Sequence, residues 1–310
     1  MNHRTKTSQR DLPKELSEVL VERLTDPTSV RDSIELLNHD VVHLAPEAFE
    51  VKRITVPLED CCLIYTWSNA AARSRAKVHE DFDLYTVVGP QARGTLDGAA
   101  LNAYELIASA PGAQVEVIID AGYEAIAWLV APQILDEQLK LRGTKRDFAT
   151  PEIPEIWHPV KDVARAHFEL GVRIAEAAEK APQIFNDNLW ARVGAQIEFM
   201  DSLISVIESC SPDDAADRDK KGRSYSEIVK KCEDYTSGLE GRRPYVSELC
   251  ALTHVSERTL QYAFRDIMGM SPVTYLHRLR LHRARDELRI AKRGSTTVTD
   301  VALNWGFWIV

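Results

Sequence analysis

The sequence of 310 residues lacks the patterns that mark secreted, membrane-embedded or zinc-binding proteins. Its five cysteines are scattered, none forms a CxxC pair, and Cys61 and Cys62 are neighbours. This usage argues against a disulfide framework or a zinc site and favours reduced thiols in a cytoplasm. No apolar run is long enough to cross a bilayer, and the polar start has no secretory signal. We therefore expect a cytoplasmic protein without a membrane partner.

Catalytic patterns are scarce as well. The sequence has no Ser-His-Asp order and no glycine loop that would cradle a phosphate. His79-Glu80-Asp81 is the one cluster that resembles a metal site, but a metal-binding cupin needs several histidines and a carboxylate from separate strands. The sequence thus predicts no catalytic residues, no metal and no cofactor. A cupin-type enzyme fused to a helical tail is the less favoured alternative, and bound metal would distinguish it.

A helix-turn-helix pattern is present near the C-terminal end. Residues 246–252 place apolar groups on one face of a short helix, and residues 253–255 break it. Ser256 is a good N-cap, because its hydroxyl can accept a hydrogen bond from the free amides of the next turn. The apolar face of the second helix is Leu260, Ala263, Phe264 and Ile267, and its outer face is Glu257, Arg258, Gln261, Tyr262 and Arg265. Two short helices with a polar outer face fit a helix-turn-helix.

Two further helix starts follow along the chain. Ser271-Pro272 combines a cap residue with proline at the first helical position, where its missing N–H costs nothing. Residues 297–300 have the sequence of a capping box, which predicts another helix. The long helix after Ser271 is expected to turn a basic side to solvent, formed by Arg278, Arg280, Arg283, Arg285 and Arg289.

These signatures together resemble the AraC/XylS family of transcription regulators. The resemblance rests on Ser256-x-x-x-Leu260-Gln261-x-x-Phe264, then Gly269-x-Ser271-Pro272-x-x-Tyr275-Leu276-x-x-x-Arg280-Leu281-x-x-Ala284, then Val301-Ala302-x-x-x-Gly306-Phe307. It implies two helix-turn-helix units joined by one long helix. It also implies a sequence-specific regulator whose partners are double-stranded DNA, RNA polymerase, a small-molecule effector and a second copy of the chain.

The resemblance assigns the DNA-contacting residues position by position. Arg258, Gln261 and Tyr262 would contact bases, with Arg258 donating to guanine edges and Gln261 pairing with adenine in the major groove. Ser256 and Arg265 are better placed for phosphates, which fix the register without specifying sequence.

The last residues depart from the family pattern. Trp308, Ile309 and Val310 follow Gly306-Phe307 directly, where the family has a second recognition helix. We therefore expect a second helix-turn-helix that is cut short. The alternative function is a truncated regulator that dimerises and binds DNA weakly, and DNA affinity would distinguish the two.

Charge is divided unevenly along the sequence. Residues 222–310 carry 14 lysines and arginines against 10 acidic residues, a net charge of +4. The net charge of the whole sequence is −9, so residues 1–221 have a net charge of −13. An acidic protein with a basic end fits contact with nucleic acid through that end alone.

The N-terminal part is predicted to be a sensor or dimerisation domain, residues 1–210. Residues 12–37 suggest one or two surface helices. Short strands between about residues 45 and 132, with a hairpin over residues 115–130, suggest a small sheet or barrel. The resemblance to the AraC/XylS family implies a cupin-like effector or dimerisation domain in this position. Four aromatic residues could line a ligand pocket or belong to the core, with core favoured: Trp67, Tyr85, Tyr104 and Trp128.

Helices are predicted over about residues 133–209. A stripe of Trp190, Val193, Ile197, Ile204 and Ile207 near heptad spacing fits either internal packing or a homodimer interface. Residues 211–223 have a linker composition, and a capping box at residues 224–227 is expected to begin the DNA-binding domain, residues 224–310. The predicted fold class is α+β, with a β-sheet or cupin-like sensor and an all-α helix-turn-helix domain.

Overall fold

A computed structural model of the chain describes residues 17–32, 34–45, 47–143, 149–210, 220–239, 242–292 and 294–307. Its strands form two antiparallel sheets, called the barrel below. Sheet A has the strand order β1 (Leu20–Leu24), β3 (Val51–Pro57), β4 (Cys61–Ser68), β11 (Tyr123–Val130), β6 (Asp83–Val88), β9 (Leu106–Ser109) and β12 (Glu155–Trp157). Sheet B has the order β2 (Leu37–His43), β5 (Ala72–Val78), β10 (Gln114–Ile119), β7 (Gly94–Leu96) and β8 (Ala99–Leu101).

The two sheets enclose the first core of the protein. Successive side chains of a strand point to opposite faces of its sheet. One set from each sheet therefore turns inward, and the buried cluster between the sheets includes Val41 and Ala72 of sheet B and Ile64 and Leu84 of sheet A. The short helix α1 (Pro27–Asp32) adds Val30 to this cluster.

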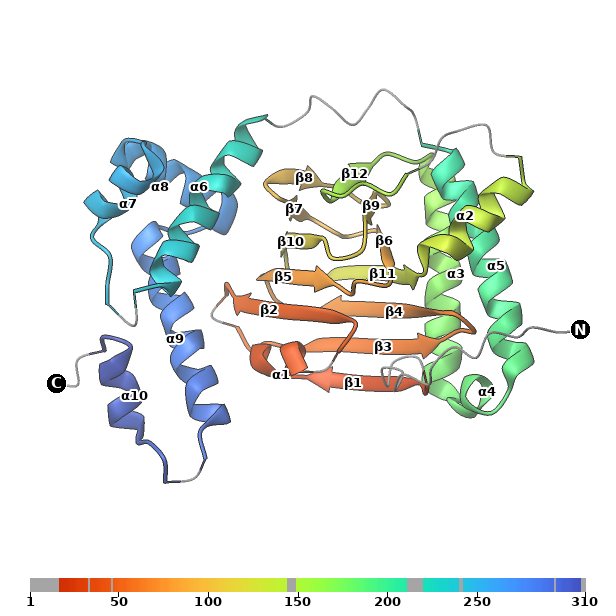
Figure 1. The fold of residues 1–310 in the computed structure, drawn as a ribbon, viewed down its shortest axis with the longest axis horizontal. Coiled ribbons are helices and arrows are strands. Elements are labelled where there is room, and N and C mark those ends of the chain that lie inside the picture. The colour runs from red at the N-terminus through yellow and green to blue at the C-terminus, as the bar shows by residue number, and fades with distance from the viewer. Residues whose placement is uncertain are drawn as a thin grey trace, which may run out of the picture.

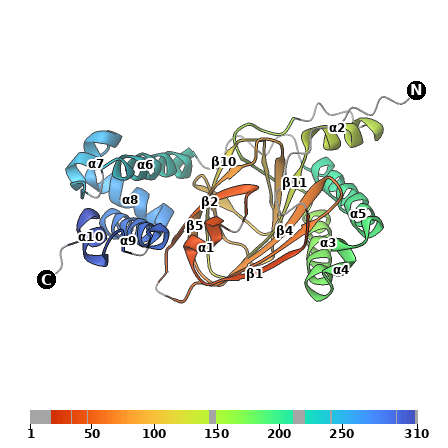
Figure 2. The ribbon, with the colours of Figure 1, turned by 60° about the horizontal axis from the view of Figure 1, so that its bottom comes forward.

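Four helices cover the outer face of sheet A (Figures 1 and 2): α2 (Pro132–Leu141), α3 (Lys161–Lys180), α4 (Gln183–Asn186) and α5 (Leu189–Glu208). Trp128 is fully buried there and meets the ring of Phe199 edge-on, with 5.2 Å between the ring centroids. Gly171 lets α3 approach the sheet closely, because an added Cβ would lie 2.7 Å from the Cγ2 atom of Ile126.

The remaining helices form a C-terminal domain on the outer face of sheet B (Figures 1 and 2): α6 (Lys220–Ser237), α7 (Val246–Thr253), α8 (Glu257–Met268), α9 (Pro272–Ile290) and α10 (Val298–Asn304). Their core contains Leu260, Phe264 and Tyr275, and it continues into Val42 and Ile118 of the barrel. The molecule is thus layered: helices, sheet A, sheet B, helices.

The α+β fold class and three predicted helix starts, at Ser256, Ser271 and Thr297, are confirmed. Ser256, Ser271 and Thr297 each accept a hydrogen bond from the backbone N–H three residues further on, at 3.2, 3.2 and 3.1 Å. His254, in the predicted break, adopts a left-handed conformation with φ 56°.

Three local predictions were wrong. Strands β10 and β11 are no hairpin, because they belong to different sheets and the turn between them crosses from one sheet to the other. Residues 20–24 and 37–43 are strands, so the β-rich part begins well before residue 45. Of the stretch predicted as surface helices, the structure describes residues 17–32 and 34–37, and only residues 27–32 of these are helical. Helix α6 begins at Lys220, so Ser224, the cap predicted at the start of the DNA-binding domain, lies inside the helix and does not begin it. The predicted linker lies mostly outside the described residues.

Candidate nucleic-acid interface

Helix α8 presents a polar face to solvent. The apolar side of α8 is completely buried, with Leu260, Ala263 and Phe264 at 0% exposure. On its other side Arg258, Tyr262 and Arg265 are exposed, and Gln261 is half-buried. Ser256 is exposed at the start of the helix. The five residues assigned to DNA contact therefore lie on or beside one accessible helix face.

Arg258 and Tyr262 hold each other on this face. The Arg258 Nε and NH2 groups donate to the Tyr262 hydroxyl at 3.2 and 3.0 Å, and the guanidinium lies 5.4 Å from the centre of the Tyr262 ring. Such a cation–π pair at an exposed site contributes about 0.5–1 kcal/mol. Arg258 is therefore held in one orientation. The contact between Arg258 and Tyr262 must break before either side chain can contact a base on its own.

Arg280, on the predicted basic side of α9, does not face solvent. Arg280 is only 5% exposed: it donates to the Trp305 carbonyl oxygen at 3.3 Å and lies 5.2 Å from the Phe307 ring. The Trp305 indole N–H donates to the Glu287 carboxylate at 2.6 Å. Arg280 thus fastens the segment after α10 to α9, and the prediction that it faces solvent was wrong.

Two further arginines of α9 are bound to acidic residues of the barrel. Arg283 donates to Asp40 of β2 at 3.0 Å, and Arg285 donates to Asp26, just before α1, at 2.6 Å. In the opposite direction, Asp286 of α9 accepts from Arg31 of α1 at 2.7 Å. Arginines of α9 that contributed to the prediction of nucleic-acid contact therefore also link the C-terminal domain to the N-terminal part of the chain.

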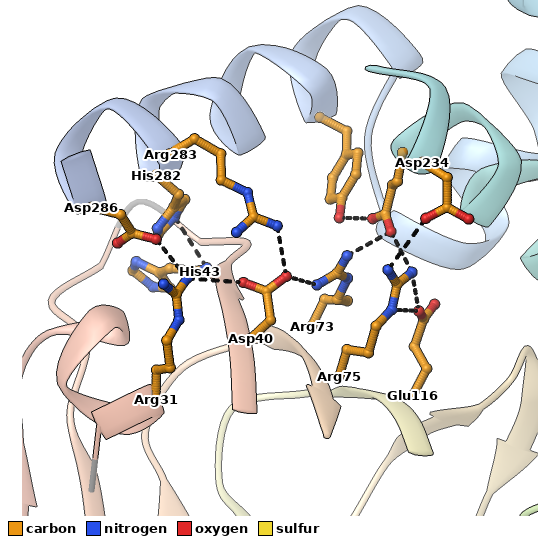
Figure 3. A network of polar contacts seen from close by, with 12 residues as sticks. Arg31, Asp40, His43, Arg73, Arg75, Glu116, Asp234, His282, Arg283 and Asp286 are labelled. Atoms are coloured by element: carbon orange, nitrogen blue, oxygen red, sulfur yellow. Dashed lines mark hydrogen bonds and ion pairs between the residues drawn. The ribbon is translucent and has the colours of Figure 1, made fainter. Parts of the chain in front are cut away.

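These contacts belong to a larger group, called the interface network below (Figure 3): Arg31, Asp40, Arg73, Arg75, Glu116, Glu233, Asp234, Tyr275, Arg283 and Asp286. At its centre the carboxylate of Glu233, from α6, accepts from Arg73 at 2.5 Å and from Arg75 at 2.7 Å. Its second oxygen accepts from the Tyr275 hydroxyl. Glu233 and Arg73 are 2% and 1% exposed, so this ion pair is excluded from water.

The network fixes the charges of its members. Burial alone would lower the pKa of Arg73, but the neighbouring Tyr275 and Glu233 raise its pKa above the ordinary value. Burial alone would raise the pKa of Asp40, yet Arg73 and Arg283 hold its pKa below the ordinary value. Both groups therefore stay charged while the C-terminal domain is docked on the barrel.

The strands that carry this network also line a cavity of about 130 Å³ between the sheets. Asp40, Arg73, Arg75 and Glu116 alternate with residues that face the cavity: His39 and Val41 of β2, Ala72, Ser74 and Ala76 of β5, and Val115 and Val117 of β10. Helix α1 also contacts both the cavity and the C-terminal domain, because Val30 lines the cavity and Arg31 contacts α9. The cavity and the C-terminal domain are thus separated by the thickness of one sheet.

None of the four aromatic residues considered for a ligand pocket lines this cavity. Tyr85 and Trp128 are buried in the core between sheet A and its helices, and Tyr104 packs against that core. Trp67 is half-buried on β4. Alternation along β4, β6 and β11 places Trp67, Tyr85 and Trp128 away from the cavity, and Tyr104 lies in the turn between β8 and β9. The structure does not bring the four together around this cavity.

The described residues contain no group of three or more His, Cys, Asp and Glu side chains arranged for a metal ion. His79, Glu80 and Asp81 lie in a turn where Glu80 pairs with Lys77 and His79 accepts from the Asp81 backbone. Within the same ranges, every helix is too short or too polar to cross a membrane.

Comparison with known proteins is most specific for the C-terminal domain. Residues 249–309 match a family described as "Helix-turn-helix domain". The regulatory protein HrpB of Ralstonia nicotianae is 34% identical over 102 residues, and the probable thc operon regulatory protein of Rhodococcus erythropolis is 31% identical over 99 residues. These matches include 32% and 30% of this chain but only 20% and 30% of those proteins.

Among solved structures, the AraC-like transcriptional activator CuxR has a TM-score of 0.40 at 11% identity, over 86% of this chain and 96% of that chain. ToxT from Vibrio cholerae has a TM-score of 0.24 at 9% identity, over 88% and 90% of the two chains. Neither likeness is close enough to transfer a ligand or an assembly. The domain match and the capped helix pair together identify the C-terminal part of the chain as a helix-turn-helix domain, in agreement with the AraC/XylS-like motifs of its sequence.

Proposed function

We propose that the chain is a sequence-specific DNA-binding transcription regulator and that α8 inserts into the major groove. The observation that carries this proposal is the accessible polar face of a helix that is capped by Ser256 and buried on its opposite side. Gln261 pairs with adenine and Arg258 with guanine, since their side chains match those base edges. Ser256 and Arg265 contact phosphates. The protein acts in the cytoplasm, with RNA polymerase as a further partner.

Selection from a random pool of duplexes tests this proposal. The protein is expected to enrich one recurring sequence. Replacing Arg265 with alanine should weaken binding to all duplexes alike and reduce the salt slope by about 0.9 for one lost phosphate contact. Enrichment of no sequence at all would leave the proposal without support.

The cavity is proposed as the site of a small-molecule effector that controls DNA binding. A ligand between the sheets pushes on strands whose opposite faces hold the interface network, and on α1, which contacts α9. A shift on one face of such a strand moves the residues on its other face. The Glu233→Gln variant is therefore expected to change DNA affinity more than the Asp234→Asn variant does. Equal affinities of both variants and the wild type would contradict this coupling.

A homodimer is proposed through α4 and α5. Of the predicted stripe, Ile204 and Ile207 are buried within the subunit, but Trp190 and Ile197 are 80% and 58% exposed. Leu189 and Ile184 extend the exposed apolar face, which a second copy of the same face would cover. Sedimentation at tens of micromolar, roughly the concentration at which a stable interface is occupied, should give a dimer. The Trp190→Glu variant should be monomeric, and an unchanged mass would count against this surface.

A further inference from the structure

The cavity between the sheets is small and mostly apolar. Its volume of about 130 Å³ is close to that of an apolar protein cavity of about 150 Å³ that holds one benzene molecule. Aliphatic side chains such as Val41, Ile64 and Val117 form most of its wall. A sugar or nucleotide would leave many polar groups unpaired here, and a long-chain lipid would not fit. The cavity therefore fits a compact ligand about the size of one six-membered ring.

A polar side chain in the cavity wall, that of His39, has an unused hydrogen-bonding atom. His39 lies in the middle of β2, facing the cavity, and its Nδ1 atom is buried without a hydrogen-bond partner among the described residues. Buried polar atoms in proteins nearly always have a partner, so an exception indicates a missing ligand or water. Burial and the nearby charge of Arg53 lower the pKa of His39 to about 3. The imidazole is therefore neutral and offers one donor and one acceptor.

The charge of Arg53 does not call for an anionic ligand. Arg53 lines the cavity from β3, and Glu22 lies directly opposite it in the register of β1 and β3. The neighbouring positive and negative groups balance each other, and an additional anion in this apolar space would be poorly solvated. A neutral ligand fits the charge of the site better than a carboxylate does.

We propose that the cavity binds a neutral, phenol-like molecule, a single ring with one hydroxyl group that hydrogen-bonds to the free ring nitrogen of His39. A hydroxyl fits because it can donate or accept, and so it serves either tautomer of the imidazole. This inference rests on the proposed function only in taking the cavity as the effector site.

Calorimetric titration of the full chain, without DNA, tests the inference with three probes of similar size: phenol, toluene and benzoate. Toluene replaces the hydroxyl by a methyl group, and benzoate carries a charge. Phenol is expected to bind about 3- to 10-fold more tightly than toluene, the range of one net hydrogen bond. Benzoate should bind more weakly than both.

Variants of His39 assign the effect to this side chain. In His39→Leu, phenol should lose its advantage over toluene, whereas His39→Gln should keep most of it because the amide still donates and accepts. His79→Gln, which changes a histidine in the exposed turn, should behave like the wild type. Tightest binding of benzoate, equal binding of phenol and toluene to the wild type, or no binding of any probe would overturn the inference. A protein that binds phenol but no duplex would retain the inference and refute the proposed function.

Discussion

Replacing Glu233 by glutamine should loosen the C-terminal domain from the barrel. Glu233 is 2% exposed and its carboxylate accepts from both Arg73 and Arg75. Glutamine keeps the shape but removes the charge, so Arg73, which is 1% exposed, loses its buried counter-charge. Removal of one partner of a buried ion pair costs about 3–5 kcal/mol. The contacts of Arg73 with Asp40 and of Arg75 with Glu116 remain, so the lower end of this range is expected.

The matched control is Asp234→Asn, in the next residue of the same helix. Asp234 is 62% exposed and lies 3.6 Å from Arg75, so the change should cost no more than about 1 kcal/mol. Urea unfolding compares the free energies of unfolding, and amide hydrogen exchange in α6 and β5 locates the loss. If the two variants lost the same stability, or if Glu233→Gln left exchange in α6 and β5 unchanged, the buried network would not hold the domains together.

Three further outcomes follow from particular residues. Burial lowers the pKa of His39 and of His167, in α3, to about 3. Because the usual pKa of 6.5 applies in the unfolded chain, only the unfolded chain binds these protons between pH 6.5 and pH 3. The free energy of unfolding is therefore highest above pH 6.5 and falls as the pH drops toward 3. Urea titrations should therefore show a loss of about 1.2 kcal/mol per histidine between pH 6 and pH 5, and equal stability at both would contradict this assignment. Gly98→Ala and Gly122→Ala both place alanine at positive φ, +81° and +84°, but only at Gly98 would the new Cβ lie 2.1 Å from a backbone oxygen of α6; only Gly98→Ala should speed hydrogen exchange in α6. Arg280→Met should speed exchange in α10, since it removes the contacts to the Trp305 carbonyl and the Phe307 ring, and protection equal to the wild type would refute that role.

Local signals in the sequence predicted local structure well. The caps at Ser256, Ser271 and Thr297 depend on hydrogen bonds that span three residues, so spacing could indicate them. The same spacing at residues 224–227 was misleading, because α6 begins earlier, at Lys220. The face of α8 followed from helical periodicity in the same way. The pairing of β10 and β11 failed because strand partners are chosen by the whole sheet and not by the nearest turn.

No local pattern in the sequence predicted the interface network or the cavity. Arg73 and Glu233 are 160 residues apart, and Arg283 and Asp40 are 243 apart, so nothing in the sequence indicated that they pair. The arginines of α9 had the spacing of a solvated face, but Arg280 binds the segment after α10. Arg283 and Arg285 bind Asp40 and Asp26 in the N-terminal part of the chain. His39 stood in a stretch expected to be outside the sheet. Its position facing the cavity depends on β2, a strand that the sequence did not reveal.

The central claim, that α8 determines DNA sequence preference through its exposed face, is tested by binding titrations on every single-base variant of the selected duplex. Wild type and Gln261→Ala are compared at one salt concentration. The variant should lose about 1–3 kcal/mol of binding free energy on the selected duplex. It should no longer distinguish the bases at one position and should keep its preference at all the others. Unchanged binding by Gln261→Ala, or a loss spread evenly over all duplexes, would contradict the assignment of this helix face to base contact.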